Sequence, residues 1–91
     1  MSPNSVLDVP DNVIAREVGG ETVILNVESG NYFGLDPIGA RIWDLLAQGL
    51  TLAAIGDVIL GEYEATRETI EQDLLQLATD LVREKLVQVR S

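Results

Sequence analysis

Two stretches near the start of the chain alternate β-branched or other apolar residues with polar ones. They span residues 13–18 and 21–27, and Gly19-Gly20 lies between them. Two consecutive glycines can both adopt positive φ without steric cost, which is typical of a tight hairpin turn. The pattern therefore predicts two antiparallel strands joined by a short turn.

A third strand is predicted at residues 31–35, after a second turn at residues 28–30. As the last strand of the meander it is expected at the sheet edge, where unpaired backbone groups must be covered or used. Tyr32 and Phe33 would add contact area there without any charge, so a guest strand could pair with this edge. The alternative is that one of the two aromatic side chains simply fills the core. Three short strands are not stable alone, so helices must cover one face.

Two short helices are predicted next. Asp36-Pro37 supplies an N-cap followed by proline at the first helical position, and Gln48-Gly49 ends this helix. Its apolar positions recur at helical spacing: Ile38, Ile42, Trp43, Leu45 and Leu46. Thr51 is the expected cap of a second helix that Gly61 closes. The buried stripe expected on that helix is Leu52, Ile55, Val58 and Ile59.

A longer third helix is predicted from Thr66, a partial cap because Thr69 stands where a capping box would have Glu, to about residue 84 or 85. Residues 86–89 are expected to form a short terminal strand. The fold class is therefore α+β, a winged helix-turn-helix with a three-stranded antiparallel sheet followed by three helices. Residues 13–91 would form this domain. Residues 1–12, which contain two prolines and few large apolar residues, are expected to be a flexible N-terminal segment.

The third helix has an apolar arc that covers about half its circumference. One line consists of Ile70, Leu74, Leu77 and Leu81, and a second line consists of Leu75, Ala78, Val82 and Leu86. One interpretation is that the helix lies centrally and buries the whole arc. The other is that part of the arc borders a groove rimmed by Asp73, Asp80 and Glu84, which would suit a peptide with apolar anchors and lysines.

Composition removes most catalytic chemistry. The chain has no histidine and no cysteine, which excludes thiolate nucleophiles, imidazole acid–base groups and the usual zinc ligands. Neither a phosphate-binding glycine loop nor a calcium loop is found, and the few serines have no base. We therefore expect no enzymatic activity, no cofactor and no metal.

The net charge of the chain restricts the kinds of partner that it can bind. Lys and Arg total 6 against 15 Asp and Glu, which gives a net charge of -9. A winged helix-turn-helix suggests a DNA-binding transcriptional regulator, and this remains the alternative. The acidic third helix would repel phosphates, so neither nucleic acid nor a membrane surface is an expected partner. A polar start and the lack of a long apolar run predict a soluble, cytoplasmic protein.

Two adjacent segments carry a family resemblance: Glu28-Ser29-Gly30-Asn31-Tyr32-Phe33-Gly34-Leu35-Asp36 and Ile38-Gly39-Ala40-Arg41-Ile42-Trp43-Asp44-Leu45-Leu46. They resemble the signature of PqqD-like proteins, which are similar to the RiPP recognition element, and the resemblance extends over nearly the whole domain. Within that group the chain looks closest to the free-standing leader-recognition subunit of lasso-peptide biosynthesis. The Ser-Gly-Asn-Tyr-Phe-Gly stretch sets it apart from the pyrroloquinoline quinone protein.

The resemblance implies a function. Members bind the leader segment of a ribosomally made precursor peptide, which adds as a strand beside the third strand and lies against the third helix. In lasso-peptide pathways a leader peptidase and a cyclase are the further partners. The implied peptide-binding residues of this chain are Asn31, Tyr32, Phe33, Gly34, Asp73, Leu74, Leu77, Ala78, Asp80, Leu81 and Glu84.

Overall fold

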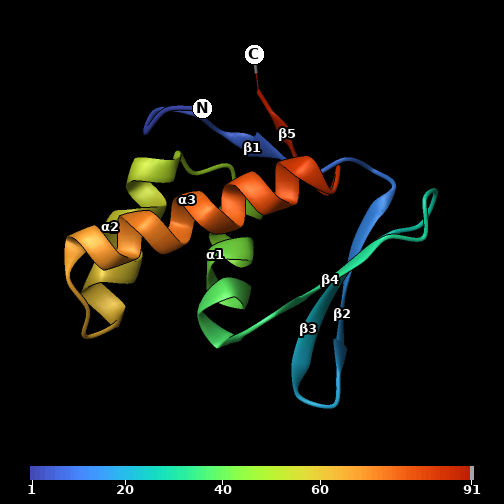
Figure 1. Ribbon diagram of the computed structural model, residues 1–91, viewed down its shortest axis with the longest axis horizontal. Coiled ribbons are helices and arrows are strands. Elements are labelled where there is room, and N and C mark those ends of the chain that lie inside the picture. The colour runs from blue at the N-terminus through green and yellow to red at the C-terminus, as the bar shows by residue number, and fades with distance from the viewer. Residues whose placement is uncertain (91) are drawn as a thin grey trace.

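The computed structural model describes residues 1–90 and contains a three-stranded sheet, three helices and a small two-stranded sheet. In chain order the elements are β1 (Leu7–Asp8), β2 (Val13–Val18), β3 (Glu21–Asn26), β4 (Tyr32–Leu35), α1 (Pro37–Ala47), α2 (Leu52–Glu62), α3 (Arg67–Arg83) and β5 (Gln88–Val89). The predicted α+β winged helix-turn-helix, with an antiparallel sheet followed by three helices, is confirmed (Figure 1).

The sheet has the strand order β2-β3-β4, and both pairings are antiparallel. Gly19 and Gly20 have φ of 60° and 85°, so the β2–β3 turn uses the positive φ that the glycine pair permits. Gly30, with φ of 78°, does the same in the β3–β4 turn. The two predicted turns and the edge position of the third strand are confirmed.

Side-chain caps fix the start of each helix, as the sequence predicts. The Gly39 N–H donates to Asp36 Oδ1 at 2.7 Å, and the Ala54 N–H donates to Thr51 Oγ1 at 3.2 Å. The Thr69 N–H donates to Thr66 Oγ1, also at 3.2 Å. The predicted end of the second helix is wrong by a short step, because α2 passes through Gly61 and ends at Glu62. Glycine is tolerated inside a helix when the backbone hydrogen bonds continue.

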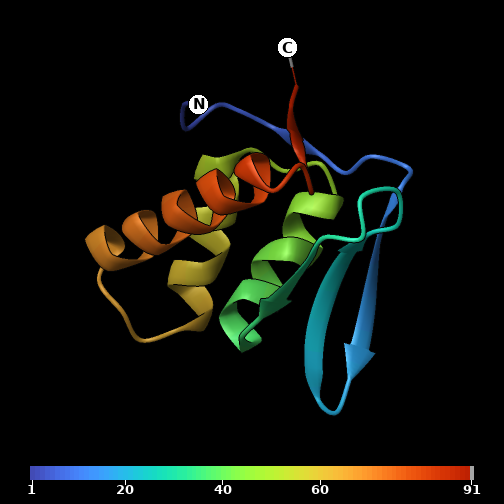
Figure 2. The ribbon, with the colours of Figure 1, turned by 45° about the vertical axis from the view of Figure 1, so that its right-hand side comes forward.

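The core lies between the helices and one face of the sheet. Ile24 of β3, Ile55 of α2 and Leu81 of α3 are fully buried and belong to one apolar cluster. Figure 2 shows that the helices gather on one side of the sheet, with α1 beside it and α3 lying across α1 and α2. The opposite face of the sheet therefore carries no helix among residues 1–90.

Residues 1–12 are joined to the domain more closely than the sequence indicates. Leu7 is only 1% exposed and belongs to the core cluster. Strand β1 pairs with β5, so Leu7 lies opposite Val89 and the two ends of the chain run side by side (Figure 1). The placement of the domain start at Val13 is therefore corrected, because a two-residue strand is too short to give a periodic signal.

Candidate functional site

A groove lies where the edge strand β4, the start of α1 and one side of α3 meet. Its volume is about 320 Å3. We call it the β4–α3 groove, and its lining consists of Phe33, Gly34, Leu35, Asp36, Ile38, Gly39, Ile42, Asp73, Gln76, Leu77 and Asp80. It combines a strand edge with a helix face, so it offers both main-chain groups and side chains to a ligand.

The free edge of β4 borders this groove. The Asn26 N–H donates to the Asn31 carbonyl at 2.8 Å, which marks that opposed pair as hydrogen-bonded. Hydrogen-bonded and non-hydrogen-bonded pairs alternate along an antiparallel ladder, so Phe33 directs its N–H and C=O toward β3. Tyr32 and Gly34 consequently direct theirs away from β3. At this edge the backbone N–H and C=O groups of Tyr32 and Gly34 are therefore unpaired.

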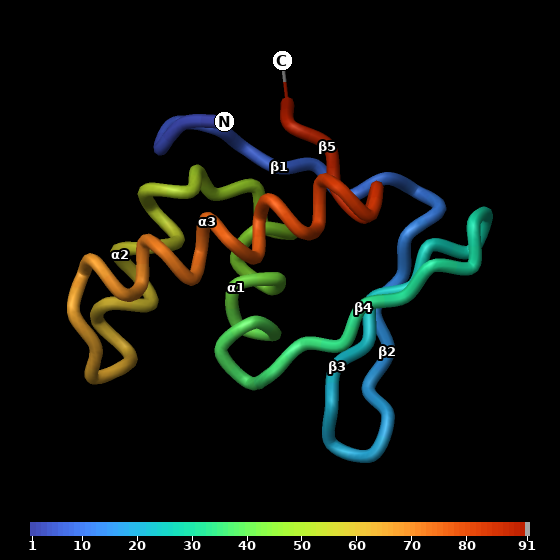
Figure 3. The backbone as a smooth tube through the Cα atoms, in the orientation of Figure 1, coloured from blue at the N-terminus to red at the C-terminus, as the bar shows by residue number. Residues whose placement is uncertain are grey.

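The β3–β4 turn is fixed by a buried asparagine, which was not among the residues predicted from the sequence. Asn26 Oδ1 accepts from the N–H of Glu28 at 3.0 Å, the N–H of Ser29 at 3.1 Å and Asn12 Nδ2 at 3.1 Å. Asn26 is the one buried polar residue among residues 1–90. Figure 3 shows how the chain leaves this turn, passes through β4 and enters α1 directly. The short Asx-type loop therefore sets where the edge strand begins.

The groove has an apolar floor and an acidic rim. Phe33, Ile38 and Leu77 supply large apolar side chains from three different elements. Asp36, Asp73 and Asp80 add carboxylates, and no lysine or arginine is part of the lining. A ligand that combines an apolar anchor with a basic group would match this surface.

The rim carboxylates differ in how far they are already satisfied. Asp80 Oδ1 accepts from Arg83 Nη2 at 2.8 Å and from Gln76 Nε2 at 3.0 Å, and Asp36 caps α1. Asp73 is exposed and has no ion-pair partner within the described chain. The negative charge of Asp73 is therefore the most available to a ligand.

The structure brings together part of the predicted site. Five of the predicted residues line the groove: Phe33, Gly34, Asp73, Leu77 and Asp80. Leu74, Ala78 and Leu81 are buried and are not part of its lining. The wide arc of α3 is thus divided: Leu77 lines the groove, Leu75 is exposed, and Leu74, Ala78 and Leu81 are buried. Helical phase alone could not assign the open flank, since that depends on where α1 and β4 lie.

Three predicted residues lie at the margins. Asn31 is exposed, and its carbonyl is committed to β3. Tyr32 is 74% exposed, and only its backbone is directed toward the groove edge. Glu84 caps the C-terminus of α3 and is not part of the groove lining.

The contribution of α1 to the groove was not predicted from the sequence. Ile38, Gly39 and Ile42 line it together with Asp36 and Gln76. Because a single residue, Asp36, separates β4 from α1, the first turn of α1 must lie against the strand, and this short connection was the available signal. Ile38 is 37% exposed, so it is the member of the predicted α1 stripe that faces the groove and not the core.

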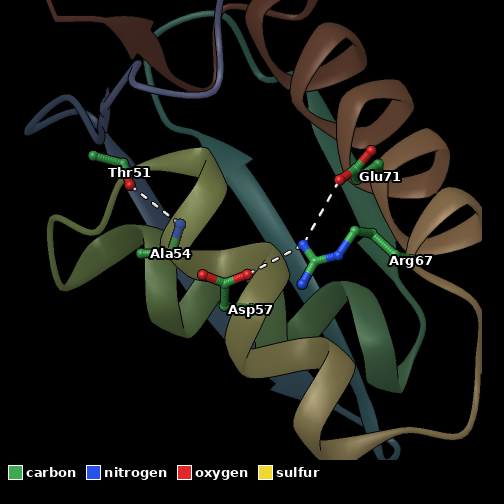
Figure 4. A network of polar contacts seen from close by, with 5 residues as sticks. All are labelled: Thr51, Ala54, Asp57, Arg67 and Glu71. Carbon is green, nitrogen blue, oxygen red and sulfur yellow. Dashed lines mark hydrogen bonds and ion pairs between the residues drawn. The ribbon is translucent and has the colours of Figure 1, made fainter.

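A second groove of about 310 Å3 lies on the other flank of α3, between α2 and the N-terminal residues. We call it the α2–α3 groove, and its lining consists of Met1, Ser2, Pro3, Leu52, Ala53, Gly56, Asp57, Arg67, Glu71, Leu74 and Leu75. Arg67 Nη1 lies 3.2 Å from Asp57 Oδ1, which links α3 to α2, and 3.8 Å from Glu71 Oε1 within α3 (Figure 4). No strand edge borders this groove.

Among residues 1–90, neither a cluster of metal-ligating side chains nor a helix long and apolar enough to cross a membrane is found. The perturbed carboxyl groups belong to ion pairs away from the β4–α3 groove. Arg41 lowers the pKa of Glu62 through a hydrogen bond between α1 and α2. Arg90 lowers the pKa of Asp8 in the same way beside β1. Both are exposed structural contacts.

Comparisons with known proteins match this chain to one family and to two solved structures. The family described as coenzyme PQQ synthesis protein D (PqqD) matches residues 21–87. The solved structure of TbiB1 in complex with the TbiA(beta) leader peptide has 36% sequence identity and a TM-score of 0.82. That match covers 92% of this chain and 98% of TbiB1.

A second solved structure, lasso peptide synthetase B1 complexed with the leader peptide, also has a TM-score of 0.82. It covers 90% of this chain and 96% of the other, but at 24% identity it supports the shared fold alone. No protein among the curated sequences matches.

Proposed function

Since the chain belongs to the PqqD family, we propose that it binds the leader segment of a ribosomally synthesised precursor peptide of the lasso-peptide type. The leader adds as a strand to the free edge of β4 and lays its side chains into the β4–α3 groove. The observation that carries this proposal is the unpaired backbone of Tyr32 and Gly34 directly beside that groove. Strand addition of this kind draws affinity from main-chain hydrogen bonds and specificity from pockets.

Two further findings support the proposal. The relative TbiB1, which matches along nearly the whole chain, was solved with a leader peptide. The stretch from Glu28 to Leu46 resembles the leader-recognition subunits of lasso-peptide pathways more than the pyrroloquinoline quinone protein. In this reading the protein is a non-catalytic cytoplasmic module, without cofactor, that delivers the precursor to a peptidase and then to a cyclase.

The acidic rim selects the charge of the leader. A lysine or arginine next to an apolar anchor of the leader would place its cation by Asp73, whose carboxylate has no ion-pair partner among residues 1–90. Asp80 contributes less, because Arg83 already neutralises it locally. Leu77 and Ile38 would receive the apolar anchor.

The DNA-binding alternative is not favoured. Asp73 and Glu71 are exposed on α3, and the protein has a net charge of -9. A DNA reader must instead neutralise phosphates with basic side chains.

The test is a pair of titrations followed by fluorescence anisotropy. One uses a labelled leader peptide of a lasso-peptide precursor, and the other uses labelled duplex DNA. We expect saturable leader binding and no retention of DNA at physiological salt. Absence of leader binding at high micromolar protein would overturn the proposal, and salt-sensitive DNA binding would support the alternative.

A further inference from the structure

The two walls of the β4–α3 groove belong to parts of the fold that are packed against different neighbours. Strands β3 and β4 pack against α1, whereas α3 packs against α2. In Figure 2, α1 lies between the sheet and the other two helices. The spacing between β4 and α3 is therefore set through other residues and not by close packing of one wall on the other.

Asn26, the last residue of β3, makes a direct hydrogen bond from the sheet to the end of α3. Its Nδ2 donates to the Lys85 carbonyl at 3.4 Å. Lys85 follows the C-cap of α3 with a φ of 60°, and the next N–H, that of Leu86, donates back to the Leu81 carbonyl at 2.9 Å. Among residues 1–90, no other hydrogen bond joins β2, β3 or β4 to α3 or to the residues that follow it.

The same side chain holds the turn that leads into β4. Asn26 Oδ1 accepts from the N–H groups of Glu28 and Ser29 and from Asn12 Nδ2. Asn26 is only 5% exposed, so solvent does not replace these partners when one is lost. The oxygen of this amide is thus committed to the β4 side of the groove, and its nitrogen to the α3 side.

We propose that Asn26 is a positioning residue for leader binding, which fixes the start of β4 relative to the end of α3 and thereby sets the width of the β4–α3 groove. This inference rests on the proposed leader binding. A leader that pairs with the backbone of Tyr32 and Gly34 must at the same time place side chains against Leu77, so both walls have to stand at the right distance. A groove that already has this spacing binds the leader without first rearranging, which raises its affinity.

Two substitutions remove the link to α3 and keep the turn. Asn26→Ser leaves a hydroxyl that accepts from the turn N–H groups but is too short to reach the Lys85 carbonyl. Asn26→Asp keeps its acceptor oxygens for the turn and places a carboxylate oxygen, which has no hydrogen to donate, against that carbonyl. One variant is neutral and the other is charged, so an effect that they share does not come from charge. If Asn26→Asp does not fold, Asn26→Ser decides alone.

The experiment titrates each variant with the labelled leader peptide of a lasso-peptide precursor, followed by fluorescence anisotropy at a temperature well below every Tm. We expect the Kd to rise about fivefold for both Asn26 variants. Asn12→Ala is the matched control, because it removes a different bond of the same amide and leaves the one to Lys85. Its Kd should stay within about twofold of wild type. Ile55→Val, in the fully buried core away from the groove, should lower the Tm and leave the Kd unchanged.

The spacing of the groove is also measured in the free protein. The chain has no cysteine, so nitroxide labels at Glu28→Cys and Thr79→Cys report the separation of the β3–β4 turn from α3 by electron paramagnetic resonance. Both positions are exposed and neither lines the groove. Asn26→Ser should broaden the distribution of this distance, whereas Asn12→Ala should leave it as in the wild type.

Three results would contradict the inference while leaving leader binding in place. A lowered Tm with an unchanged Kd for the Asn26 variants would show that Asn26 only stabilises the fold. Equal losses of affinity in Asn12→Ala and Asn26→Ser would assign the effect to the loop before β2 and not to α3. Weaker binding with an unchanged label separation would mean that groove width is not the cause. Failure of the wild-type protein to bind the leader would overturn the proposed function, and this inference with it.

Discussion

The two flanks of α3 border grooves of nearly equal volume, about 320 Å3 and about 310 Å3, yet only one is suited to a peptide strand. The β4–α3 groove has a free sheet edge along one wall. The α2–α3 groove is bounded by helices and the first residues of the chain, and Arg67 of α3 forms an ion pair with Asp57 of α2 (Figure 4). Helix backbone is hydrogen-bonded internally and offers a guest nothing to pair with.

In this fold, an apolar groove without a free strand edge is not expected to bind a peptide strand. The β4–α3 groove differs because it is bordered by Tyr32 and Gly34, whose backbone N–H and C=O groups form no hydrogen bonds with β3. The following changes are chosen to affect one flank of α3 and spare the other.

The largest effect is expected from Gly34→Pro. Proline removes the N–H that faces the groove and leaves the pairing of Phe33 with Ile24 in place, since proline is tolerated on edge strands. A lost hydrogen bond and an unpaired carbonyl in the leader together cost about 2 kcal/mol, or about thirtyfold in Kd. Isothermal titration with the leader peptide measures it.

Gly34→Ala is the matched control for that change. A Cβ at this position meets no heavy atom within 4 Å, and alanine keeps the N–H. Leader affinity should stay within about twofold of wild type. Equal losses for alanine and proline would mean that the side chain, and not the edge hydrogen bond, is what matters at Gly34.

A smaller effect is expected from Leu77→Ala, which shortens the largest apolar side chain that α3 contributes to the β4–α3 groove. Loss of a partly buried leucine contact corresponds to about tenfold weaker leader binding. Leu75→Ala on the other flank should change the Kd less than about twofold. If the Leu75 variant were the weaker binder, the leader would have to lie in the α2–α3 groove instead.

The acidic rim should give a still smaller, salt-dependent effect. With a lysine-bearing leader, Asp73→Lys is expected to weaken binding about fivefold at low ionic strength and much less at high ionic strength. Asp80→Lys should weaken leader binding less, because Arg83 and Gln76 already donate hydrogen bonds to the Asp80 carboxylate. Anisotropy titrations at two salt concentrations measure both. Salt-independent affinities for both variants would identify the rim as ordinary solvated surface.

The smallest effect is expected from Asp8→Asn, a change in β1, the strand that follows the N-terminal residues lining the α2–α3 groove. Arg90 Nε donates to Asp8 at 3.1 Å and keeps the pKa of Asp8 below its ordinary 3.8. A carboxyl group with a lowered folded-state pKa stabilises the fold above its unfolded pKa and loses that effect as the pH falls through the folded value. Asp8→Asn should therefore lower the Tm slightly at neutral pH, and the difference should vanish well below pH 3.8.

Thermal melts across that pH range test this expectation, with leader binding as the second readout. The leader Kd should not change, since β1 and β5 do not line the β4–α3 groove. A weaker leader affinity of Asp8→Asn would show that the two flanks are coupled.

Local signals in the sequence were sufficient for most of the fold. Asp36-Pro37, Thr51 and Thr66 each mark a helix start by a capping bond within three residues, and Gly19-Gly20 marks its turn by φ alone. Strand β1 was not predicted because two residues carry no period and the strand with which they pair, β5, lies about 80 residues away along the chain.

The groove was predicted only in part, and for the same reason. That Leu77 lines the β4–α3 groove while Leu74 and Leu81 do not depends on how α1 and β4 lie against α3, and helical periodicity carries no information on that arrangement. The bonds of Asn26, which fix the start of β4, join residues 12, 28, 29 and 85. Such contacts become visible only in the folded chain.

The central claim, that the leader pairs with the free edge of β4, is tested most directly by backbone amide hydrogen exchange followed by NMR. In the free protein the Tyr32 and Gly34 amides should exchange fast, because no partner in the sheet protects them. Saturating leader peptide should slow both by at least about tenfold and leave amides beside the α2–α3 groove unchanged. Unchanged exchange at Tyr32 and Gly34, with the leader bound, would contradict the account.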